Sequence, residues 1–290
     1  MEQVAALNEE AIEAWNGPLF DRFLAFRPIV TTGLGNHGEA LLAWQPPGAG
    51  DRVLDIGCGF GDTTQRLAGL VGEAGSATGV DAAERFIGLA RSEARDAGLE
   101  NVAYRVGDVQ VMTFEERFDY AFSRMGTMFF ASPVAALRNV RAALVPGGRL
   151  CMVVWRRKLD NDWLHRGEVI VNRFVERPEV YDEPTCGPGP FSMADADTTT
   201  EILTAAGFSH ITLRRCDIEI MVGATLDEAI EVVMSLGPAG EILRLQGERA
   251  AHLLPAIDTA LREGMGEFVR EDGVWAPAST WLVAAHAPAA

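Results

Sequence analysis

Lysine is nearly absent from the sequence, and acidic residues far outnumber basic ones. Lys158 is the only lysine, and 41 acidic against 25 basic residues give a formal net charge of −16 at pH 7. A surface that binds nucleic acid or an anionic membrane needs clustered lysine or arginine to contact phosphates, and no run of the arginines forms such a patch. The composition therefore predicts a protein without a nucleic-acid partner.

Cysteine and long apolar runs are also scarce. Four cysteines form neither a C-x-x-C pair nor a zinc-binding spacing, so we expect reduced thiols and no bound metal ion; they are Cys58, Cys151, Cys186 and Cys216. No apolar run approaches the roughly 20 residues that cross a bilayer. The first turns of the chain lack the pattern of a signal peptide. We therefore expect no membrane insertion and a cytoplasmic location.

Glycine, in contrast, is concentrated in one informative stretch, RVLDIGCGFGDTT at residues 52–64. Three alternating glycines, Gly57, Gly59 and Gly61, follow a short apolar segment and precede helical sequence. Glycine permits positive φ and a close approach of ligand to backbone, and the following helix N-terminus favours an anionic group. An ordinary strand–turn–helix would also fit this stretch. Asp62, however, stands where the dinucleotide fingerprint G-x-G-x-x-G has its third glycine, so a dinucleotide turn is not indicated.

Strand-like and helix-like segments alternate after residue 52. Strands are predicted at 53–56, 77–81, 102–106, 118–122 and 149–155, with helices at 62–70, 83–97 and 132–144 between them. Such alternation indicates right-handed crossovers and a parallel sheet. With further strands at 210–220 and 279–285, the predicted fold class is α/β, a Rossmann-like and mostly parallel seven-stranded sheet with helices on both faces.

The chain is expected to divide into four regions. Residues 1–45 form an N-terminal helical arm, 46–221 the Rossmann-like core, 222–274 a helical cap inserted between the last two strands, and 275–290 the last strand and tail. A capping-box pattern from Thr225 to Glu228 begins the first cap helix. The arm either folds over a ligand bound at the glycine turn or packs on the edge of the core.

Polar residues stand at the ends of successive predicted strands. Asp81 ends the second strand, Asp108 follows the third, and Ser123 with Arg124 ends the fourth. In open parallel sheets, ligands bind beyond these strand ends. Each acid alone is more often a cap or turn residue. Together they favour a nucleoside-sized site, in which Asp81 accepts hydrogen bonds from ribose hydroxyls and Asp108 accepts one from an exocyclic amine.

These motifs resemble the class I S-adenosylmethionine (SAM)-dependent methyltransferases, in the small-molecule branch that includes the ubiquinone/menaquinone C-methyltransferases. The resemblance covers residues 50–155 in order and at the spacing of that family. It is carried by VLDIGCGFG at 53–61, GVD at 79–81, GDV at 107–109, FDYAFSR at 118–124 and LVPGGRL at 144–150.

The resemblance implies SAM as cofactor and S-adenosyl-L-homocysteine as product. Asp55 would reach the ammonium of the methionine end directly or through water, Asp81 would bind the ribose, and Asp108 the adenine amine. Ala82, with Ala83 after it, departs from relatives that often have serine and a bulky apolar residue against adenine. The full set of implied cofactor residues is Asp55, Gly57, Gly59, Gly61, Asp81, Ala82, Asp108, Val109 and Ser123.

The implied reaction is an in-line displacement at a sulfonium methyl group, for which the protein mainly supplies positioning and the exclusion of water. A general base is needed only if the nucleophile arrives protonated. His37 in the arm and His165 after the fifth strand are the candidates, although a histidine at such a position is more often a surface or packing residue.

The expected acceptor is a small, partly apolar metabolite, bound between the core, the arm and the 222–274 cap. Predicted pocket walls are Arg124, Met125, Phe129, Trp155 and Phe191, of which Phe129 and Trp155 could be core residues instead. A homodimer stays open. Two other functions also stay open: a SAM-binding protein that transfers no methyl group, and a SAM-fold enzyme whose chemistry has drifted to cyclisation or decarboxylation.

Overall fold

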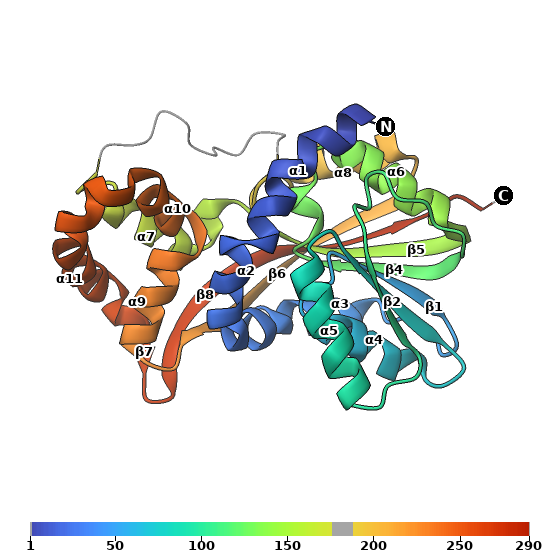
Figure 1. Cartoon of the computed structure of the whole chain (residues 1–290), viewed down its shortest axis with the longest axis horizontal. Helices are drawn as coiled ribbons and strands as arrows, with labels where there is room; N and C mark the ends of the chain where they lie inside the picture. The colour runs from blue at the N-terminus through green and yellow to red at the C-terminus, as the bar shows by residue number, and fades with distance from the viewer. Residues whose placement is uncertain (1, 176–187, 290) are drawn as a thin grey trace.

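The computed structural model describes residues 2–175 and 188–289. A sheet crosses the middle of the molecule, and helices pack around it (Figure 1). Its strands follow the order β3-β2-β1-β4-β5-β8-β6, and the short β7 pairs with β8. The strand bounds are β1 Arg52–Ile56, β2 Ser76–Asp81, β3 Val102–Val106, β4 Phe118–Arg124, β5 Leu144–Trp155, β6 Ser209–Gly223, β7 Val269–Arg270 and β8 Gly273–His286.

The sheet has the mostly parallel, Rossmann-like arrangement that the sequence predicts. Strands β1 to β5 run parallel, and β8 runs antiparallel between β5 and β6. β1 lies between β2 and β4, where Val53 pairs with both Ala77 and Tyr120. Because the strand is covered on both faces, every residue of β1 after Arg52 is buried, which explains why Val53, Leu54 and Ile56 are apolar; Asp55 is the exception. The two-residue β7 was not predicted.

Helices cover both faces of the sheet. Val53 on β1 lies in an apolar cluster with Leu41 of α3 (Gly35–Trp44) and Leu67 of α4 (Asp62–Val71). Leu54, the next residue, points to the opposite face, as strand geometry requires. There it joins a cluster that includes Leu137 of α6 (Pro133–Ala143) and residues of α8 (Ala196–Ala206). α5 (Glu84–Asp96) packs on β2 and β3.

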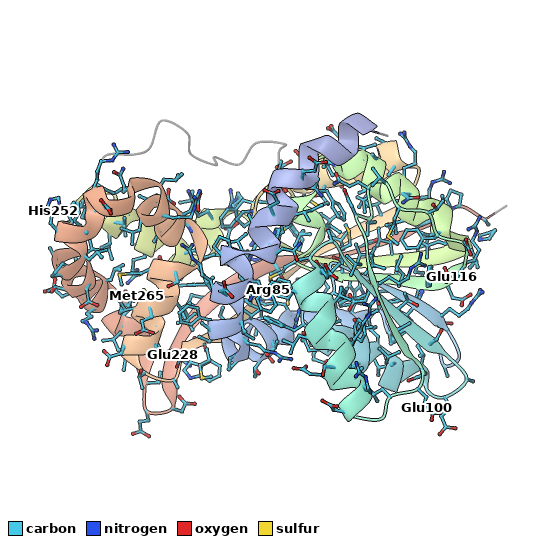
Figure 2. All side chains as sticks on the ribbon, in the orientation of Figure 1. Arg85, Glu100, Glu116, Glu228, His252 and Met265 are labelled. Atoms are coloured by element: carbon cyan, nitrogen blue, oxygen red, sulfur yellow. The ribbon has the colours of Figure 1, made fainter. Side chains whose placement is uncertain are left out.

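The N-terminal arm lies across the sheet next to α5 (Figure 1). Its first two helices are α1 (Glu2–Asn16) and α2 (Pro18–Ala25), and Pro18 begins α2 at a position where its missing N–H is not needed. Arg85 of α5, which Figure 2 labels between α5 and the arm, bonds to both α1 and α2. Its backbone N–H donates to Asn16 Oδ1 at 3.2 Å, and its guanidinium pairs with Asp21 at 2.8 Å.

The remaining helices form a bundle beyond the sheet, on the left of Figure 1. α9 (Leu226–Ser235), α10 (Gly237–Gln246) and α11 (Leu254–Met265) come from the predicted insertion, and Thr225 Oγ1 accepts from the Glu228 N–H at 3.2 Å as the capping pattern predicts. α7 (Asp162–Val171) follows β5 in the chain but packs against α10 and α11. β6 and β8 are longer than predicted and continue past the sheet as the antiparallel ribbon that carries this bundle.

No helix in the part of the chain that the structure describes has the length and apolar character of a transmembrane span.

Candidate functional site

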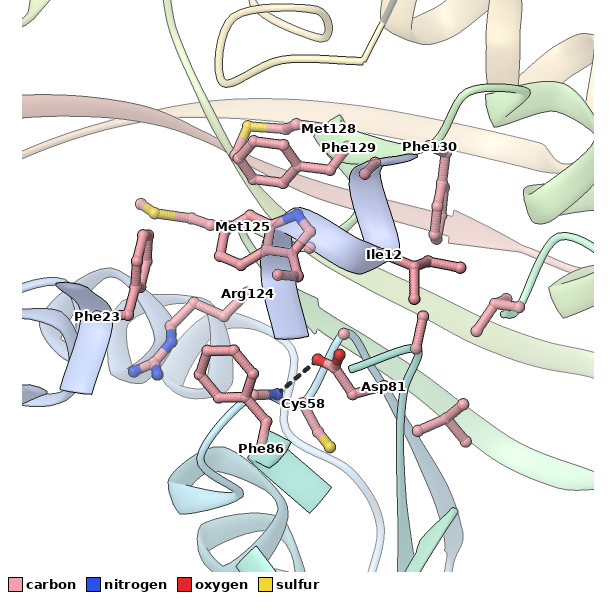
Figure 3. Close-up of a pocket in the computed structure, with 18 of the residues that line it drawn as sticks. Ile12, Phe23, Cys58, Asp81, Phe86, Arg124, Met125, Met128, Phe129 and Phe130 are labelled. Carbon is pink, nitrogen blue, oxygen red and sulfur yellow. Dashed lines mark hydrogen bonds between the residues drawn. The ribbon is translucent and has the colours of Figure 1, made fainter. Parts of the chain in front are cut away.

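A cavity of about 230 Å³ opens at the carboxyl ends of β1 to β5 (Figure 3). The core supplies its floor through the turns that follow these strands. The arm supplies its roof, through Asn8, Ala11, Ile12 and Trp15 of α1 and Phe23 of α2. The cavity therefore lies where an open parallel sheet places its ligand.

The glycine turn after β1 borders the cavity with bare backbone. Gly57 and Gly59 line it and have φ of +66° and +51°, in the left-handed region that favours glycine. A side chain at Gly57 would approach the Gly126 backbone to 3.0 Å. The turn thus combines a strained backbone path with space for a ligand directly against the main chain.

Asp81 ends β2 with both carboxylate oxygens held by backbone donors. Oδ2 accepts from the Gly59 N–H at 3.0 Å, the bond dashed in Figure 3, and Oδ1 accepts from the Ala83 N–H at 2.9 Å. Burial raises the pKa of this carboxyl, against the lowering effect of the two backbone donors. Each oxygen keeps further acceptor capacity on the cavity side. Asp81 is therefore held in one orientation at the edge of the cavity.

Asp108, after β3, connects the cavity floor to its roof. Its Oδ1 accepts from the Gln110 N–H at 2.9 Å, and its Oδ2 accepts from the Asn8 Nδ2 of α1 at 3.3 Å. The amide of Asn8 thus occupies the kind of position that the exocyclic amine of a bound base would take beside this carboxylate. The arm is therefore in polar contact with the Asp108 end of the cavity.

An ion pair closes the other end of the cavity. Arg124, the last residue of β4, donates to Asp62 Oδ2 at 2.8 Å, and Asp62 is the first residue of α4. The Arg124 side chain is 13% exposed and that of Asp62 29%. Figure 3 shows Arg124 reaching away from Asp81. The charged groups at the two ends of the cavity are therefore well separated.

The space between these ends is apolar and rich in aromatic rings. Trp15 makes edge contacts with Phe23 and Phe129, with ring centroids 5.0 and 5.2 Å apart, and a longer one with Phe86 at 6.3 Å. Met125 also lines the cavity and has a φ of +58°, which is unusual for a side chain other than glycine, asparagine or aspartate. A strained residue beside the cavity, facing an aromatic wall, indicates that this part of the turn is shaped for a ligand.

Residues 47–207, more than half of the chain, match a family model described as a methyltransferase domain. The chain belongs to this methyltransferase family. It is 37% identical over 114 residues to an aklanonic acid methyltransferase of Streptomyces sp., which covers 39% of this chain and 52% of that protein. It is 31% identical over 166 residues to a ubiquinone biosynthesis O-methyltransferase of Roseobacter denitrificans, which covers 53% of this chain and 65% of that protein.

The alignments thus span about half the length of the first relative and 65% of the second. Among solved structures, the YcgJ protein of Bacillus subtilis superposes with a TM-score of 0.57 at 17% identity, over 89% of this chain and 99% of that one. That likeness shows the fold alone. Family and fold together confirm the resemblance and the fold class that the sequence predicts.

Most residues that the sequence singled out converge on this cavity. Its lining includes ten of them: Gly57, Gly59, Asp81, Ala82, Asp108, Val109, Arg124, Met125, Phe129 and Trp155. Three others stand behind the lining. Gly61 caps α4, Asp55 accepts from the Thr64 hydroxyl at 2.6 Å and is 1% exposed, and the buried Ser123 donates its hydroxyl to the Ile56 carbonyl at 2.8 Å.

Three expected residues lie away from the cavity. Phe191 is buried in the main apolar cluster. His37 is fully buried, with Nδ1 2.9 Å from the Thr280 hydroxyl, and burial lowers its pKa to about 4, against a smaller raising effect of Asp217. His165 lies on α7 in the helical bundle. Neither histidine borders the cavity.

The expectation that the 222–274 cap forms a wall of the pocket is wrong for this cavity. Of the described residues that line it, none comes from that segment. The reason is topological: the bundle stands on the extension of β8 and β6, which lie two and three strands away from β4 in the sheet, respectively. The many apolar residues of the 222–274 segment are instead buried where α9, α10 and α11 pack with one another and with α7.

The arm residues of the roof were missed, although a sequence signal for them exists. Asn8, Ala11, Ile12 and Trp15 follow the i, i+3, i+4, i+7 spacing of a single helix face. That spacing predicts a helix face that packs against another surface. Only the fold shows that this surface is the edge of the core where the parallel strands end.

The unusual state of Asp55 gives the first prediction. Burial raises its pKa to about 7 in the folded protein, from the ordinary 3.8. Between about pH 4 and 7 the folded state holds a proton that the unfolded state has released, so stability falls as pH rises, and it levels off above pH 7. In Asp55→Asn this loss should disappear, while the amide oxygen still accepts from Thr64.

We therefore expect the unfolding free energy of the ligand-free variant to exceed that of the wild type by an amount that grows with pH, by up to about 1.4 kcal/mol per pH unit. Urea denaturation at pH 4.5, 6 and 8 measures this difference. A difference that stays constant across the three pH values would contradict the burial of an ionisable carboxyl at this position.

Proposed function

We propose that the protein is a SAM-dependent methyltransferase that acts on a small, planar and largely apolar acceptor. The observation that carries this proposal is the order of the groups along the cavity. In the sheet order β3-β2-β1-β4, Asp108 follows β3, Asp81 ends β2, and Gly57 and Gly59 follow β1. Neighbouring strands lie about 4.8 Å apart. This order of groups therefore matches a ligand with an amine-bearing base, then a ribose diol, and then an aliphatic chain that lies against the glycine backbone.

The residues present fit this cofactor chemically. The Asp81 carboxylate is oriented by the Gly59 and Ala83 N–H groups toward a diol. Asp108 already accepts an amide donor from Asn8, so it can accept an exocyclic amine in its place. The turn at Gly57 and Gly59 leaves no side chain in the path of the ligand. When bound, SAM supplies an electrophilic methyl group on a sulfonium centre.

The protein's own contribution to transfer is positioning and the exclusion of water. Trp15, Phe23 and Phe129 form an apolar wall for a flat acceptor, and α1 with α2 covers the cavity. Alignment of two reactants in one closed site can account for roughly 7–11 kcal/mol of barrier lowering at best. The net charge of −16 supports a small-molecule acceptor over a nucleic acid.

Methyl transfer is tested with isotopically labelled SAM and a panel of planar phenols, 1,3-dicarbonyl carbon acids, aromatic carboxylates and aromatic amines. We expect label to enter one of these classes, with one S-adenosyl-L-homocysteine formed per methylated product, as mass spectrometry measures. Binding of SAM with conversion of an acceptor but without consumption of SAM would contradict methyl transfer and favour a drifted chemistry.

The Trp15→Ala variant tests whether Trp15 contributes to acceptor binding and not to cofactor binding. Trp15 contacts three cavity rings, and each aromatic pair contributes about 0.5–1.5 kcal/mol beyond simple burial. We expect kcat/KM for the acceptor to fall by about 10-fold or more while the Kd for S-adenosyl-L-homocysteine changes by less than about 3-fold.

The matched control is Trp44→Ala, at the end of α3 and outside the cavity lining. It should leave both constants near those of the wild type. Equal losses of acceptor and cofactor binding in Trp15→Ala would instead indicate that the whole arm had detached.

A further inference from the structure

We propose that Asp62 and Arg124 form a receptor for the zwitterionic amino-acid end of SAM, in which Arg124 binds the α-carboxylate and Asp62 binds the α-ammonium. In the ligand-free protein the two side chains neutralise each other across 2.8 Å. The amino-acid end would enter between them, and each charge would exchange its protein partner for a ligand partner. This inference rests on the proposed function, because it assigns residues to the cofactor of that function.

The position of the pair along the sheet supports this assignment. β4 is the strand next to β1, and the register pairs Asp55 of β1 with Phe122 of β4. Arg124 ends β4, and Asp62 starts the helix directly behind the glycine turn. If the base lies at β3, the ribose at β2 and the sulfur beside the glycine turn, then the amino-acid end lies at β4. Of the described residues that line the cavity, Arg124 alone is basic.

The local structure is built around the Arg124 side chain. A Cβ at Gly35 or Gly38 of α3 would stand 3.3 Å from its Nη1 or Cδ, so these glycines leave the space through which it passes. Its Nη1 also donates to the Thr31 carbonyl at 3.4 Å. A guanidinium offers five N–H donors, and these two contacts leave others for a carboxylate in the planar, two-pronged geometry that arginine favours.

The pair also has room to open. A second cavity of about 260 Å³ lies between α3 and the start of α4, and Asp62 and Arg124 line it as well as the first. The ion pair thus stands between two hollows rather than inside packed protein. Small movements of either side chain can admit a ligand group without displacing the core.

Asp62 replaces Asp55, the residue that the family resemblance implied for the ammonium. Asp55 is 1% exposed, accepts from Thr64 and does not border the cavity, whereas Asp62 does. A zwitterion suits this site because insertion keeps both half-buried charges compensated. A ligand with only one of its two charges would leave Asp62 or Arg124 without a full partner, which is costly for charges removed from water.

Calorimetric binding of three ligands to Asp62→Asn and Arg124→Gln tests the assignment. S-adenosyl-L-homocysteine carries both charges, decarboxylated SAM carries the ammonium but no carboxylate, and 5′-methylthioadenosine carries neither. We expect each variant to bind S-adenosyl-L-homocysteine at least about 10-fold more weakly than the wild type, since a charge-assisted hydrogen bond is lost. Affinity for 5′-methylthioadenosine should change by less than about 3-fold in both variants.

Decarboxylated SAM separates the two roles. Its affinity should fall in Asp62→Asn but not in Arg124→Gln. Controls are Arg52→Gln and Asp119→Asn, which remove an exposed ion pair of 3.1 Å at the opposite end of β1 and β4 and should leave all three affinities unchanged. Asp62→Glu and Arg124→Lys keep the charges, and should retain more affinity for S-adenosyl-L-homocysteine than the neutral variants; they replace those variants if removal of a charge prevents folding.

The outcomes that overturn the proposal are distinct from failure of the proposed function. Unchanged S-adenosyl-L-homocysteine affinity in both neutral variants overturns it, as do equal losses for S-adenosyl-L-homocysteine and 5′-methylthioadenosine. If Arg124→Gln raises only the KM of the acceptor, Arg124 binds an acceptor anion and the assignment to SAM is wrong. A wild-type protein that binds none of the three ligands overturns the cofactor assignment itself.

Discussion

Asp81→Asn is expected to weaken SAM binding by about 100-fold or more, because two charge-assisted hydrogen bonds of about 1.5–3 kcal/mol each are lost. In the wild type, Oδ2 accepts from the Gly59 N–H and Oδ1 from the Ala83 N–H, so both oxygens already face backbone donors. An asparagine has only one oxygen. Its NH₂ group would therefore face one of these N–H groups, donor against donor, and could not accept a ribose hydroxyl.

Titration calorimetry with SAM measures this loss, and a thermal melt of each protein reports whether the fold is retained. Asp119→Asn is the matched control, since Asp119 also lies on a sheet strand but pairs with Arg52 far from the cavity. It should bind SAM as the wild type does. An unchanged Kd in a folded Asp81→Asn protein would remove the ribose from this position.

The positions of the parallel strands and the residues at their carboxyl ends could be predicted because each rests on local sequence. The order of the strands in the sheet comes from the structure alone. Val53, Leu54 and Ile56 place apolar side chains on both faces of the strand, which is typical of a central parallel strand, and the glycines after it need positive φ. Because parallel strands have their carboxyl ends at the same edge of the sheet, Asp81 and Asp108 emerge together at that edge. The position of these two residues at the cavity can therefore be inferred without knowing any contact between segments far apart in the sequence.

The direction of Asp55 could not be predicted in the same way. Strand alternation places Val53 and Asp55 on one face and Leu54 on the other, but both faces of a central strand are buried. Whether the carboxyl meets a ligand or a neighbouring helix depends on Thr64, one turn into α4. The family motif suggested that the Asp55 carboxyl contacts the ligand. In the structure α4 packs so that the Thr64 hydroxyl donates to this carboxyl.

The sequence also did not predict which helices pack together when they are far apart in the chain. The periodicity of α7 predicts a helix with one apolar face, and it follows β5 in the chain. Its apolar residues nevertheless pack with α10 and α11, which arrive some 70 residues later through a ribbon that extends past the sheet. Likewise the face of α1 that includes Ile12 and Trp15 gives no indication of whether it covers a core edge or a cavity. Periodicity identifies an apolar face but not the surface that it meets.

The third glycine of the motif is expected to matter for folding rather than for the cofactor. Gly61 has a φ of +80°, and a Cβ there would stand 2.5 Å from the Tyr104 hydroxyl and 2.8 Å from the Ala90 Cβ. Left-handed backbone costs a non-glycine residue about 1–2 kcal/mol, and overpacking costs about 1–3 kcal/mol more. Gly61→Ala should therefore lower the unfolding free energy by roughly 3 kcal/mol, as urea denaturation measures.

Gly69 provides the matched control within the same helix. It is exposed on α4 and needs no positive φ, and a Cβ there would meet no atom within 4 Å beyond its own helix. Gly69→Ala should therefore raise stability, by up to about 1 kcal/mol, since alanine favours helix over glycine. If Gly61→Ala were as stable as the wild type but failed to bind SAM, the third glycine would contact the cofactor after all. The opposite pattern, a destabilised protein that still binds SAM when folded, is expected because the Gly61 carbonyl accepts from Tyr104 behind the cavity wall.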